Sequence, residues 1–231
     1  MKEPRWKTLT AMNEGKEHVI VRETTDTLPP VRQLLVNNVR ESAAYVSAER
    51  KNELVFTYMK SFARIFDALA PAAKETLLFG GAGFSFPRFY ISRYPDKRMD
   101  VVEIRRYMFD LAVRYFFLDD LYEEYALNVS RRLQIFIEDA NDFLKKNRAQ
   151  YDVIINDAYV GNVPDQGLLS DKSARLIRGA LRFGGFYIVN LITAPTGYHS
   201  MPGVMAQAVL KIHLKNIHVS TSCRLFFSVM S

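Results

Sequence analysis

The sequence predicts an α/β fold in which a doubly wound, mostly parallel sheet follows a small β-rich unit. After Pro71, short apolar runs of strand length alternate with segments of helical periodicity, the pattern of a parallel sheet with crossover helices. Before Pro71, residues 18–46 alternate loosely around a Pro29-Pro30 break, as short strands do. The length of 231 residues, 48% of them hydrophobic, suffices for one sizeable domain with a small addition.

The first third of the chain is expected to contain a flexible N-terminal segment, several short strands and one long helix. From Ser47 onward, an apolar stripe at helical spacing predicts a long helix that Pro71 ends. The stripe consists of Leu54, Val55, Tyr58, Met59, Phe62, Ile65, Phe66 and Leu69. The predicted division is a flexible N-terminus at 1–17, a small β-subdomain with its linking helix at 18–70, and the doubly wound domain at 71–231.

Beyond Pro71, strands and helices are expected in alternation, which predicts a Rossmann-like sheet. The predicted strands are residues 76–80, 99–104, 133–138, 151–156, 186–192, 217–220 and 225–230. The predicted helices are residues 105–117, 141–147, 171–181 and 205–214. One more helix is expected directly after the glycine-rich segment that follows the first strand, with Pro87 in its first turn.

The composition narrows the classes of partner. The net charge is +6, but no dense block of Lys and Arg carries it, so we expect no nucleic-acid partner. No apolar run approaches the roughly 20 residues that cross a bilayer, so we expect no membrane span. No Asp or Glu follows Asp171, whereas several Lys and Arg residues do. This asymmetry indicates either a solvated basic face or a surface for an anionic substrate or partner.

Cysteine and histidine usage predicts neither disulfide nor metal chemistry. Cys223 is the only cysteine, and the first residues contain no apolar leader, so we expect a cytoplasmic protein. The histidines show no paired spacing with carboxylates, so no metal site is expected at His18, His199, His213 or His218.

The first strand of the larger domain ends in a glycine-rich segment, Gly80-Gly81-Ala82-Gly83. In an open parallel sheet, ligands bind outside the carboxyl ends of the strands, where the strand order reverses. Three glycines in four positions permit positive φ and a close approach of the backbone to a ligand, although a tight turn alone could also require them. The position between a buried strand and a helix favours binding.

The next two strands end in acidic residues suited to a nucleoside. Glu103 lies 23 residues after Gly80, where a carboxylate can accept hydrogen bonds from both ribose hydroxyls. Asp139 can accept a hydrogen bond from an adenine amino group while the backbone amide of Ala140 meets the ring. Asp139 can equally cap the helix that follows, and the two roles are compatible.

The fourth strand ends before Asp157, at the centre of the predicted sheet. A carboxylate there can act as a general base, hold a cationic substrate amine, or simply cap a loop or helix. Tyr159 follows in the same loop and can reach the same cleft, although an ordinary packing role is equally open.

Together these stretches resemble the spermidine synthase family and its spermidine-synthase-like relatives, which have the class I AdoMet-dependent methyltransferase fold. The resemblance covers about residues 18–192 and rests on TLLFGGAGFSFPR, DVVEI, QIFIEDANDFL, YDVIINDAY and LRFGGFYIVNL. The upstream HVIVRETTD and VRQLLVNNVRESAAYV resemble the family's small N-terminal β-subdomain, and NELVFTYM its following helix. The resemblance implies a seven-stranded sheet and an adenosyl donor, S-adenosylmethionine (AdoMet) or its decarboxylated form.

The resemblance also implies roles for the strand-end residues. The donor would be held by Gly80, Gly81 and Gly83 at its amino-acid moiety, by Glu103 at the ribose, and by Asp139 and Ala140 at the adenine. Asp157 would bind and deprotonate an attacking amine, with Tyr159 as a second catalytic candidate.

The chain departs from the true polyamine synthases at several positions. It lacks the family's second Asp after Asp157 and the usual Asp of the glycine loop. The family's Tyr-His-Glu-Met tetrad reads Phe56-Thr57-Tyr58-Met59, and a family Gln appears as Glu41. Because a polycationic substrate needs several carboxylates, these departures predict little conversion of putrescine to spermidine.

Three functions are therefore weighed. The first is an AdoMet-type transferase that moves a methyl or aminopropyl group to a small-molecule acceptor of unknown identity. The second is a non-catalytic nucleoside-binding module of the same fold. The third is a nicotinamide-dependent oxidoreductase, against which Phe86 counts because the dinucleotide fingerprint needs Gly or Ala at that position. A homodimer is left open.

Overall fold

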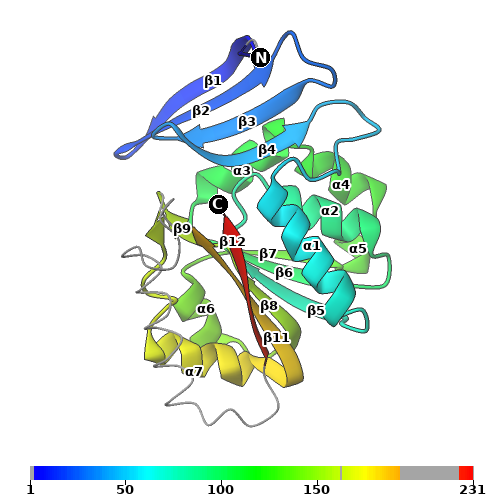
Figure 1. Cartoon of the computed structure of the whole chain (residues 1–231), viewed down its shortest axis with the longest axis vertical. Coiled ribbons are helices and arrows are strands. Elements are labelled where there is room, and N and C mark those ends of the chain that lie inside the picture. The colour runs from blue at the N-terminus through cyan, green and yellow to red at the C-terminus, as the bar shows by residue number, and fades with distance from the viewer. Residues whose placement is uncertain (1–2, 162, 193–223, 231) are drawn as a thin grey trace.

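An antiparallel sheet forms the N-terminal part of the computed structural model, which describes residues 3–161, 163–192 and 224–230 (Figure 1). Its strands pair in chain order: β1 (Trp6–Glu14), β2 (Glu17–Thr24), β3 (Val31–Val36) and β4 (Val39–Tyr45). Between β3 and β4, Asn37 and Asn38 both have positive φ, as the two-residue turn of a tight hairpin requires. The short strands expected in residues 18–46 are confirmed.

The start of the chain differs from the sequence prediction. Residues 1–17 are expected to be flexible, but residues 6–14 form β1, which pairs with β2. Leu9 and Met12 of this strand are partly buried and pack against the core of the sheet, and the pairing register shifts between Thr8 and Thr10. This irregularity breaks the period-two alternation of apolar residues, which is why the sequence shows no strand here.

The second sheet is parallel, with strand order β12-β11-β8-β5-β6-β7 in the described residues. Its strands are β5 (Glu75–Phe79), β6 (Arg98–Glu103), β7 (Leu133–Ile137), β8 (Tyr151–Asn156), β11 (Leu181–Ile192) and β12 (Arg224–Met230). A two-residue ladder, β9 (Tyr159–Val160) with β10 (Val163–Pro164), lies in the loop after β8. The α/β class is confirmed, whereas seven strands are not: the described part of the sheet has six.

Helices cover both faces of the parallel sheet (Figure 1). They are α1 (Thr57–Leu69), α2 (Ser85–Arg93), α3 (Arg106–Tyr115), α4 (Leu118–Glu124), α5 (Leu127–Ser130), α6 (Ala140–Lys146) and α7 (Asp171–Ala180). Strand side chains alternate between two cores, so Leu78 packs with α1 and α2 while Leu77 and Phe79 pack with α6 and α7. Burial on both faces explains why these strands are continuously apolar.

Several element predictions need adjustment. The helix expected after Ser47 begins only at Thr57, and α4 and α5 are not predicted from the sequence. The strand expected at 225–230 is confirmed as β12. The helix expected at 205–214 and the strand expected at 217–220 lie outside the described residues. The linking helix α1 packs into the core of the parallel sheet, and the boundaries at 17 and 70 remain predictions.

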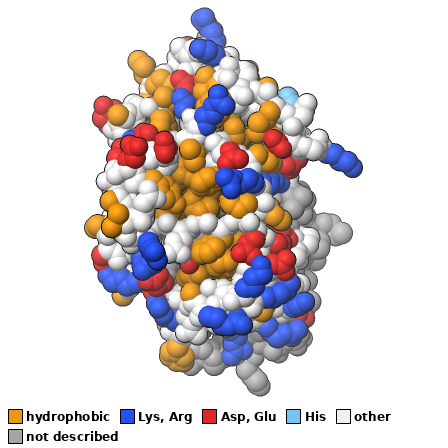
Figure 2. All heavy atoms as spheres, turned by 180° about the vertical axis from the view of Figure 1, so that it is seen from behind, with side chains coloured by type: hydrophobic (Ala, Val, Ile, Leu, Met, Phe, Trp, Pro, Cys, Tyr) orange, Lys and Arg blue, Asp and Glu red, His pale blue; other side chains and the backbone are white. Residues whose placement is uncertain are grey.

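The basic excess late in the chain lies on the surface where it is described. Lys172, Arg175 and Arg178 of α7 are exposed, and so is Arg182 after it. Figure 2 shows blue Lys and Arg side chains gathered over the lower half of the back of the molecule. This arrangement favours the interpretation of a solvated basic face. Within the described residues, no helix is both long and apolar enough to span a bilayer.

Candidate functional site

A cavity of about 320 Å³ lies at the carboxyl ends of the parallel strands. Its wall comes from the loops after β5, β6, β7 and β8, from β11 and α1, and from β4 of the N-terminal sheet. The strand order reverses between β5 and β8, because β6 continues on one side of β5 while β8 lies on the other. The cavity is therefore at the position where open α/β sheets bind ligands, and its volume suits a small molecule.

Gly80 brings the ends of β5 and β8 together. The amide of Asp157 donates to the carbonyl of Phe79 at 3.0 Å, and the amide of Gly80 donates to the carbonyl of Val102 at 2.9 Å. Gly80 has φ +89°, and a Cβ at this position would lie 2.6 Å from the carbonyl oxygen of Asp157. Only glycine fits this crossing of the two strand ends.

The other two glycines of the loop are needed for different contacts. A Cβ on Gly81 would lie 2.7 Å from the ring of Phe84, and one on Gly83 would lie 2.6 Å from Oγ of Ser42 in β4. Gly81 lines the cavity and Gly83 does not. A contact between Gly83 and a ligand therefore stays a prediction, and the role that the structure shows is that its missing side chain lets Ser42 of the N-terminal sheet approach.

Glu103 holds the glycine loop with its carboxylate. Its Oε2 accepts hydrogen bonds from the amides of Gly81 at 2.8 Å and Ala82 at 3.0 Å, and its Oε1 accepts one from the amide of Arg105 at 2.9 Å. A carboxylate has about four acceptor positions, so three are filled by the chain itself. Glu103 lines the cavity, and its ribose contact remains a prediction that would have to share these oxygens.

Asp139 and Ala140 line the cavity at the end of β7, next to the loop after β6. The carboxylate of Asp139 accepts a hydrogen bond from the amide of Asp142 at 3.0 Å, which makes it the N-cap of α6. The capping role is confirmed. The adenine contact remains a prediction, and it is compatible with the cap because the second carboxylate oxygen has no hydrogen bond within the described chain.

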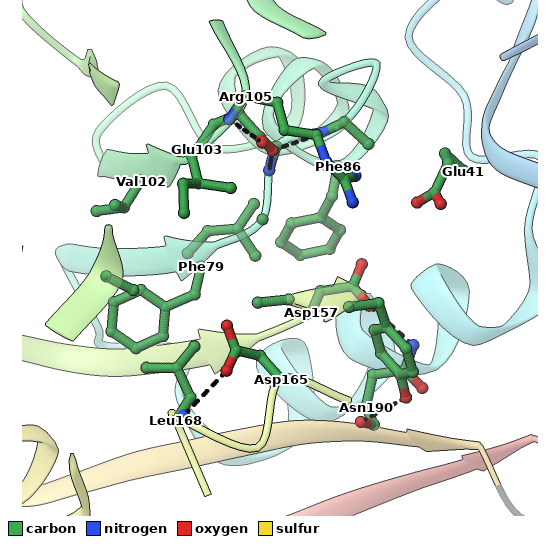
Figure 3. Close-up of a pocket in the computed structure, with 18 of the residues that line it drawn as sticks. Glu41, Phe79, Phe86, Val102, Glu103, Arg105, Asp157, Asp165, Leu168 and Asn190 are labelled. Carbon is green, nitrogen blue, oxygen red and sulfur yellow. Dashed lines mark hydrogen bonds between the residues drawn. The ribbon is translucent and has the colours of Figure 1, made fainter. Parts of the chain in front are cut away.

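Asp157 lies at the end of β8 with both carboxylate oxygens engaged. Oδ2 accepts a hydrogen bond from the hydroxyl of Tyr58 at 3.1 Å, and Oδ1 accepts one from Nδ2 of Asn190 at 2.8 Å (Figure 3). Burial raises the pKa of Asp157 to about 7, against these two hydrogen bonds, and the negative charge of Glu41 raises it further. This carboxyl can exchange a proton near neutral pH.

Tyr159 also lines the cavity, but its hydroxyl donates to the backbone carbonyl of Asn190 at 2.8 Å. The contact holds the loop after β8 against the end of β11. A catalytic role for Tyr159 remains a prediction, and positioning Asn190 is the role that its contact supports.

Sequence reasoning missed two partners of Asp157. Tyr58 falls on the apolar stripe of α1, so the pattern assigns it to the core, while Asn190 sits inside an apolar strand run. Asn190 is only 3% exposed, and its Oδ1 has no hydrogen-bond partner in the described structure. A polar residue within an otherwise apolar strand was the available signal, since such a side chain needs a partner when buried.

The cavity wall is rich in acid. Its carboxylates are Glu41, Glu103, Glu138, Asp139, Asp157 and Asp165, and its cations are Arg40 and Arg105. Glu41, Glu138 and Asp165 were not among the predicted site residues. Although the chain lacks some carboxylates of the family motifs, six carboxylates, that of Asp157 included, line the cavity. In the described ranges, no group of three or more His, Cys, Asp or Glu is arranged to hold a metal ion.

Comparison with known sequences agrees with this geometry. The family model described as the spermine/spermidine synthase domain matches residues 55–195, more than half of the chain. A polyamine aminopropyltransferase of Agathobacter rectalis is 30% identical over 105 residues, which cover 45% of this chain and 34% of that protein. A polyamine aminopropyltransferase of Vibrio vulnificus is 24% identical over 131 residues, which cover 55% and 41%. The matches thus span less than half of either relative.

The fold is also similar to that of solved spermidine synthases. A crystal structure of a spermidine synthase in complex with the transition state analogue AdoDATO superposes with a TM-score of 0.61 at 15% identity, covering 93% of this chain and 72% of that one. At such identity the likeness concerns the fold alone. The match of the family model, however, includes the strands that carry Gly80, Glu103, Asp139 and Asp157. By this match, which spans β5 to β11 of the parallel sheet and the site at the strand ends, the chain belongs to the spermine/spermidine synthase domain family.

Proposed function

We propose that this chain is a group transferase that uses an adenosyl sulfonium donor, AdoMet or decarboxylated AdoMet, and a small amine acceptor. The observation that carries the proposal is Asp157, a half-buried carboxylate at the switch point of the sheet with a pKa raised by burial to about 7. A base with this pKa can take a proton from an amine near neutral pH.

The nucleoside part of the donor fits the other end of the cavity. Gly80 and Gly81 leave the backbone open there, and Glu103 and Asp139 bring carboxylates to the ends of two neighbouring strands. The relatives named as polyamine aminopropyltransferases and the fold neighbour complexed with AdoDATO make this donor class the natural choice. Whether a methyl or an aminopropyl group moves depends on which donor binds.

In the proposed reaction, Asp157 accepts a proton from the ammonium form of the acceptor. The freed nitrogen lone pair forms a bond to a carbon next to the sulfonium sulfur. The bond from that carbon to sulfur breaks, and its electron pair returns to sulfur, which leaves as a neutral thioether. The chain contributes the base and the alignment, since Tyr58 and Asn190 fix both oxygens of Asp157.

Calorimetry with AdoMet, decarboxylated AdoMet, methylthioadenosine and NAD tests the donor class. We expect adenosyl sulfur compounds to bind and NAD not to bind. Product analysis with each donor and a series of small amines then tests turnover, and putrescine is expected to be a poor acceptor. Binding without any product would favour the non-catalytic module, and binding of NAD alone would overturn the assignment.

A further inference from the structure

Glu41 differs from the other carboxylates that line the cavity, because no group of the described chain satisfies it. Glu103 is held by three backbone amides, and Glu138 pairs with Lys146 at 2.9 Å. Asp139 caps α6, Asp165 accepts from the amide of Gly167, and Asp157 has Tyr58 and Asn190. Glu41 makes no hydrogen bond or ion pair within the described residues, although its side chain is half-buried.

The two arginines that line the cavity do not form an ion pair with Glu41. Arg105 lines the same cavity, but its Nη2 lies 3.1 Å from Oε1 of Glu17, so that guanidinium is paired with the neighbouring strand β2. Arg40, next to Glu41 in β4, is exposed. A half-buried carboxylate without a partner is unfavourable unless it is protonated or meets a cation.

The surroundings of Glu41 agree with this reasoning. Burial raises the pKa of Glu41 to about 7, against the charge of Arg105, and the charges of Glu103 and Glu17 raise it further. Asp157 faces the same space, and its pKa is raised in turn by the charge of Glu41. Figure 3 shows the Glu41 carboxylate pointing into the open space between Arg105 and Asp157. A ligand cation at this position would stabilise the ionised forms of both Glu41 and Asp157.

Asn190 points independently to a ligand in the same place. Its Oδ1 is a buried acceptor without a partner, in a side chain that lines the cavity and is 3% exposed. An N–H group of a ligand would complete it. The cavity end around Asp157 therefore holds an unpaired anion, an unpaired acceptor and a base, a combination that matches a ligand with more than one amino group.

We propose that Glu41 is the recognition residue for a primary ammonium group of the substrate, across the cavity from Asp157 and Asn190. This inference rests on the proposed transferase function and deepens it. The ammonium belongs either to the donor's side chain or to the end of the acceptor that does not react. In both cases Glu41 attracts the ammonium group by its negative charge. Glu41→Gln keeps the size and shape of the side chain but removes that charge, so the preference for the ammonium-bearing ligand should be lost.

The test compares ligands that differ by one ammonium group in the wild-type protein, in Glu41→Gln and in Glu14→Gln. Glu14 is an exposed residue of β1, so its variant controls for the loss of one negative charge in the same sheet. The donor arm uses 5′-propylthioadenosine and decarboxylated S-adenosylhomocysteine, which differ only in the primary ammonium at the end of the three-carbon chain. The acceptor arm uses 1,3-diaminopropane and propylamine. Calorimetry gives each dissociation constant, and melting temperatures check folding.

We expect Glu41→Gln to lose about tenfold to a hundredfold in affinity for the ammonium-bearing member of one pair, while Glu14→Gln keeps the wild-type values. A loss in the donor arm assigns the ammonium to the donor, and a loss in the acceptor arm assigns it to the acceptor. Equal ligand preferences in wild type and folded Glu41→Gln in both arms would overturn the proposal.

Proton release provides a second measurement. A cation beside Glu41 at pH 7 favours its ionised form, so binding should release protons, which appear as a dependence of the binding heat on the buffer's ionisation enthalpy. Glu41→Gln should reduce this release, and unchanged release would count against the proposal. If no adenosyl compound binds the wild-type protein, the transferase function fails, and the diamine arm alone decides the role of Glu41.

Discussion

The two ends of the cavity differ in how fully the chain satisfies their polar groups. At the glycine loop, the carboxylate of Glu103 accepts three backbone hydrogen bonds, and Gly80 fits a crossing that no side chain could enter. At the end of β8, Glu41 has no partner in the described chain and Asn190 has an unpaired oxygen. The carboxylate of Glu103 is satisfied without a ligand, whereas Glu41 and Asn190 have polar atoms that a ligand would satisfy.

The difference teaches how one cavity can combine rigidity with reactivity. A site for a nucleoside gains from a loop fixed in advance, because less ordering remains to be done on binding. A site for proton transfer gains from a carboxyl whose burial raises its pKa toward neutrality. The predictions below separate these two roles, beginning with the largest effect.

Asp157→Asn should break the reactive end alone. The substitution keeps the shape and removes the base, so we expect the turnover rate to fall by about 10² or more, with adenosyl affinity nearly intact. Melting temperature should not fall at pH 8, since a buried charge is removed. Rates, affinities and melting curves of the purified variant check this. Normal turnover in a stable variant would remove Asp157 from the catalytic residues.

Glu103→Ala should break the fixed end. The loop amides lose their acceptor, so both stability and adenosyl affinity should fall, the latter by about tenfold to a hundredfold, which corresponds to roughly 1.5–3 kcal/mol. Calorimetry measures the affinity, and Glu14→Gln again controls for charge. An unchanged dissociation constant for every adenosyl ligand would exclude Glu103 from the nucleoside site.

The pH dependence of stability should sharpen the contrast, because its source lies at the reactive end. The pKa values of Glu41 and Asp157 are raised from 4.5 and 3.8 to about 7, so the folded state holds these protons more tightly than the unfolded state. The free energy of unfolding should therefore decrease as pH rises from about 4 to about 7, by up to about 3 kcal/mol for each carboxyl.

Urea unfolding of the wild type and of the Glu41→Gln, Asp157→Asn double variant, measured across this pH range, checks the prediction. The double variant should have the flatter profile, because it lacks both titrating groups. If the two profiles coincide, the pKa values of Glu41 and Asp157 are not raised in the folded protein.

Tyr58→Phe should produce the smallest effect. The hydroxyl of Tyr58 donates to Asp157 and thereby lowers its pKa against burial, so its removal should raise that pKa. The acid limb of the kcat/KM profile should then move to higher pH, with a few-fold loss of rate at pH 7. A drop in rate without a shift of the limb would mean that Tyr58 acts only through packing.

Some of the site could be predicted from the sequence because the responsible signals are local. Gly80, Glu103, Asp139 and Asp157 each follow a run of strand-forming residues, and parallel strands bring such positions to one edge. Gly83 shows the limit of this reasoning. It belongs to the same motif, yet its backbone faces Ser42 of β4, and no local pattern records a contact across 41 residues.

The sequence by itself determined the α/β class, most of the strands and helices, and the edge of the sheet that carries the site, because hydrophobic periodicity and strand-end residues act over short stretches of chain. Only the tertiary structure decided that β1 completes the N-terminal sheet, that Glu103 is occupied by the glycine loop, and that Glu41, Tyr58 and Asn190 meet around Asp157. These relations join residues far apart in the chain. Burial, hydrogen-bond satisfaction and pKa depend on what surrounds a group in space, which the packing of the two sheets sets.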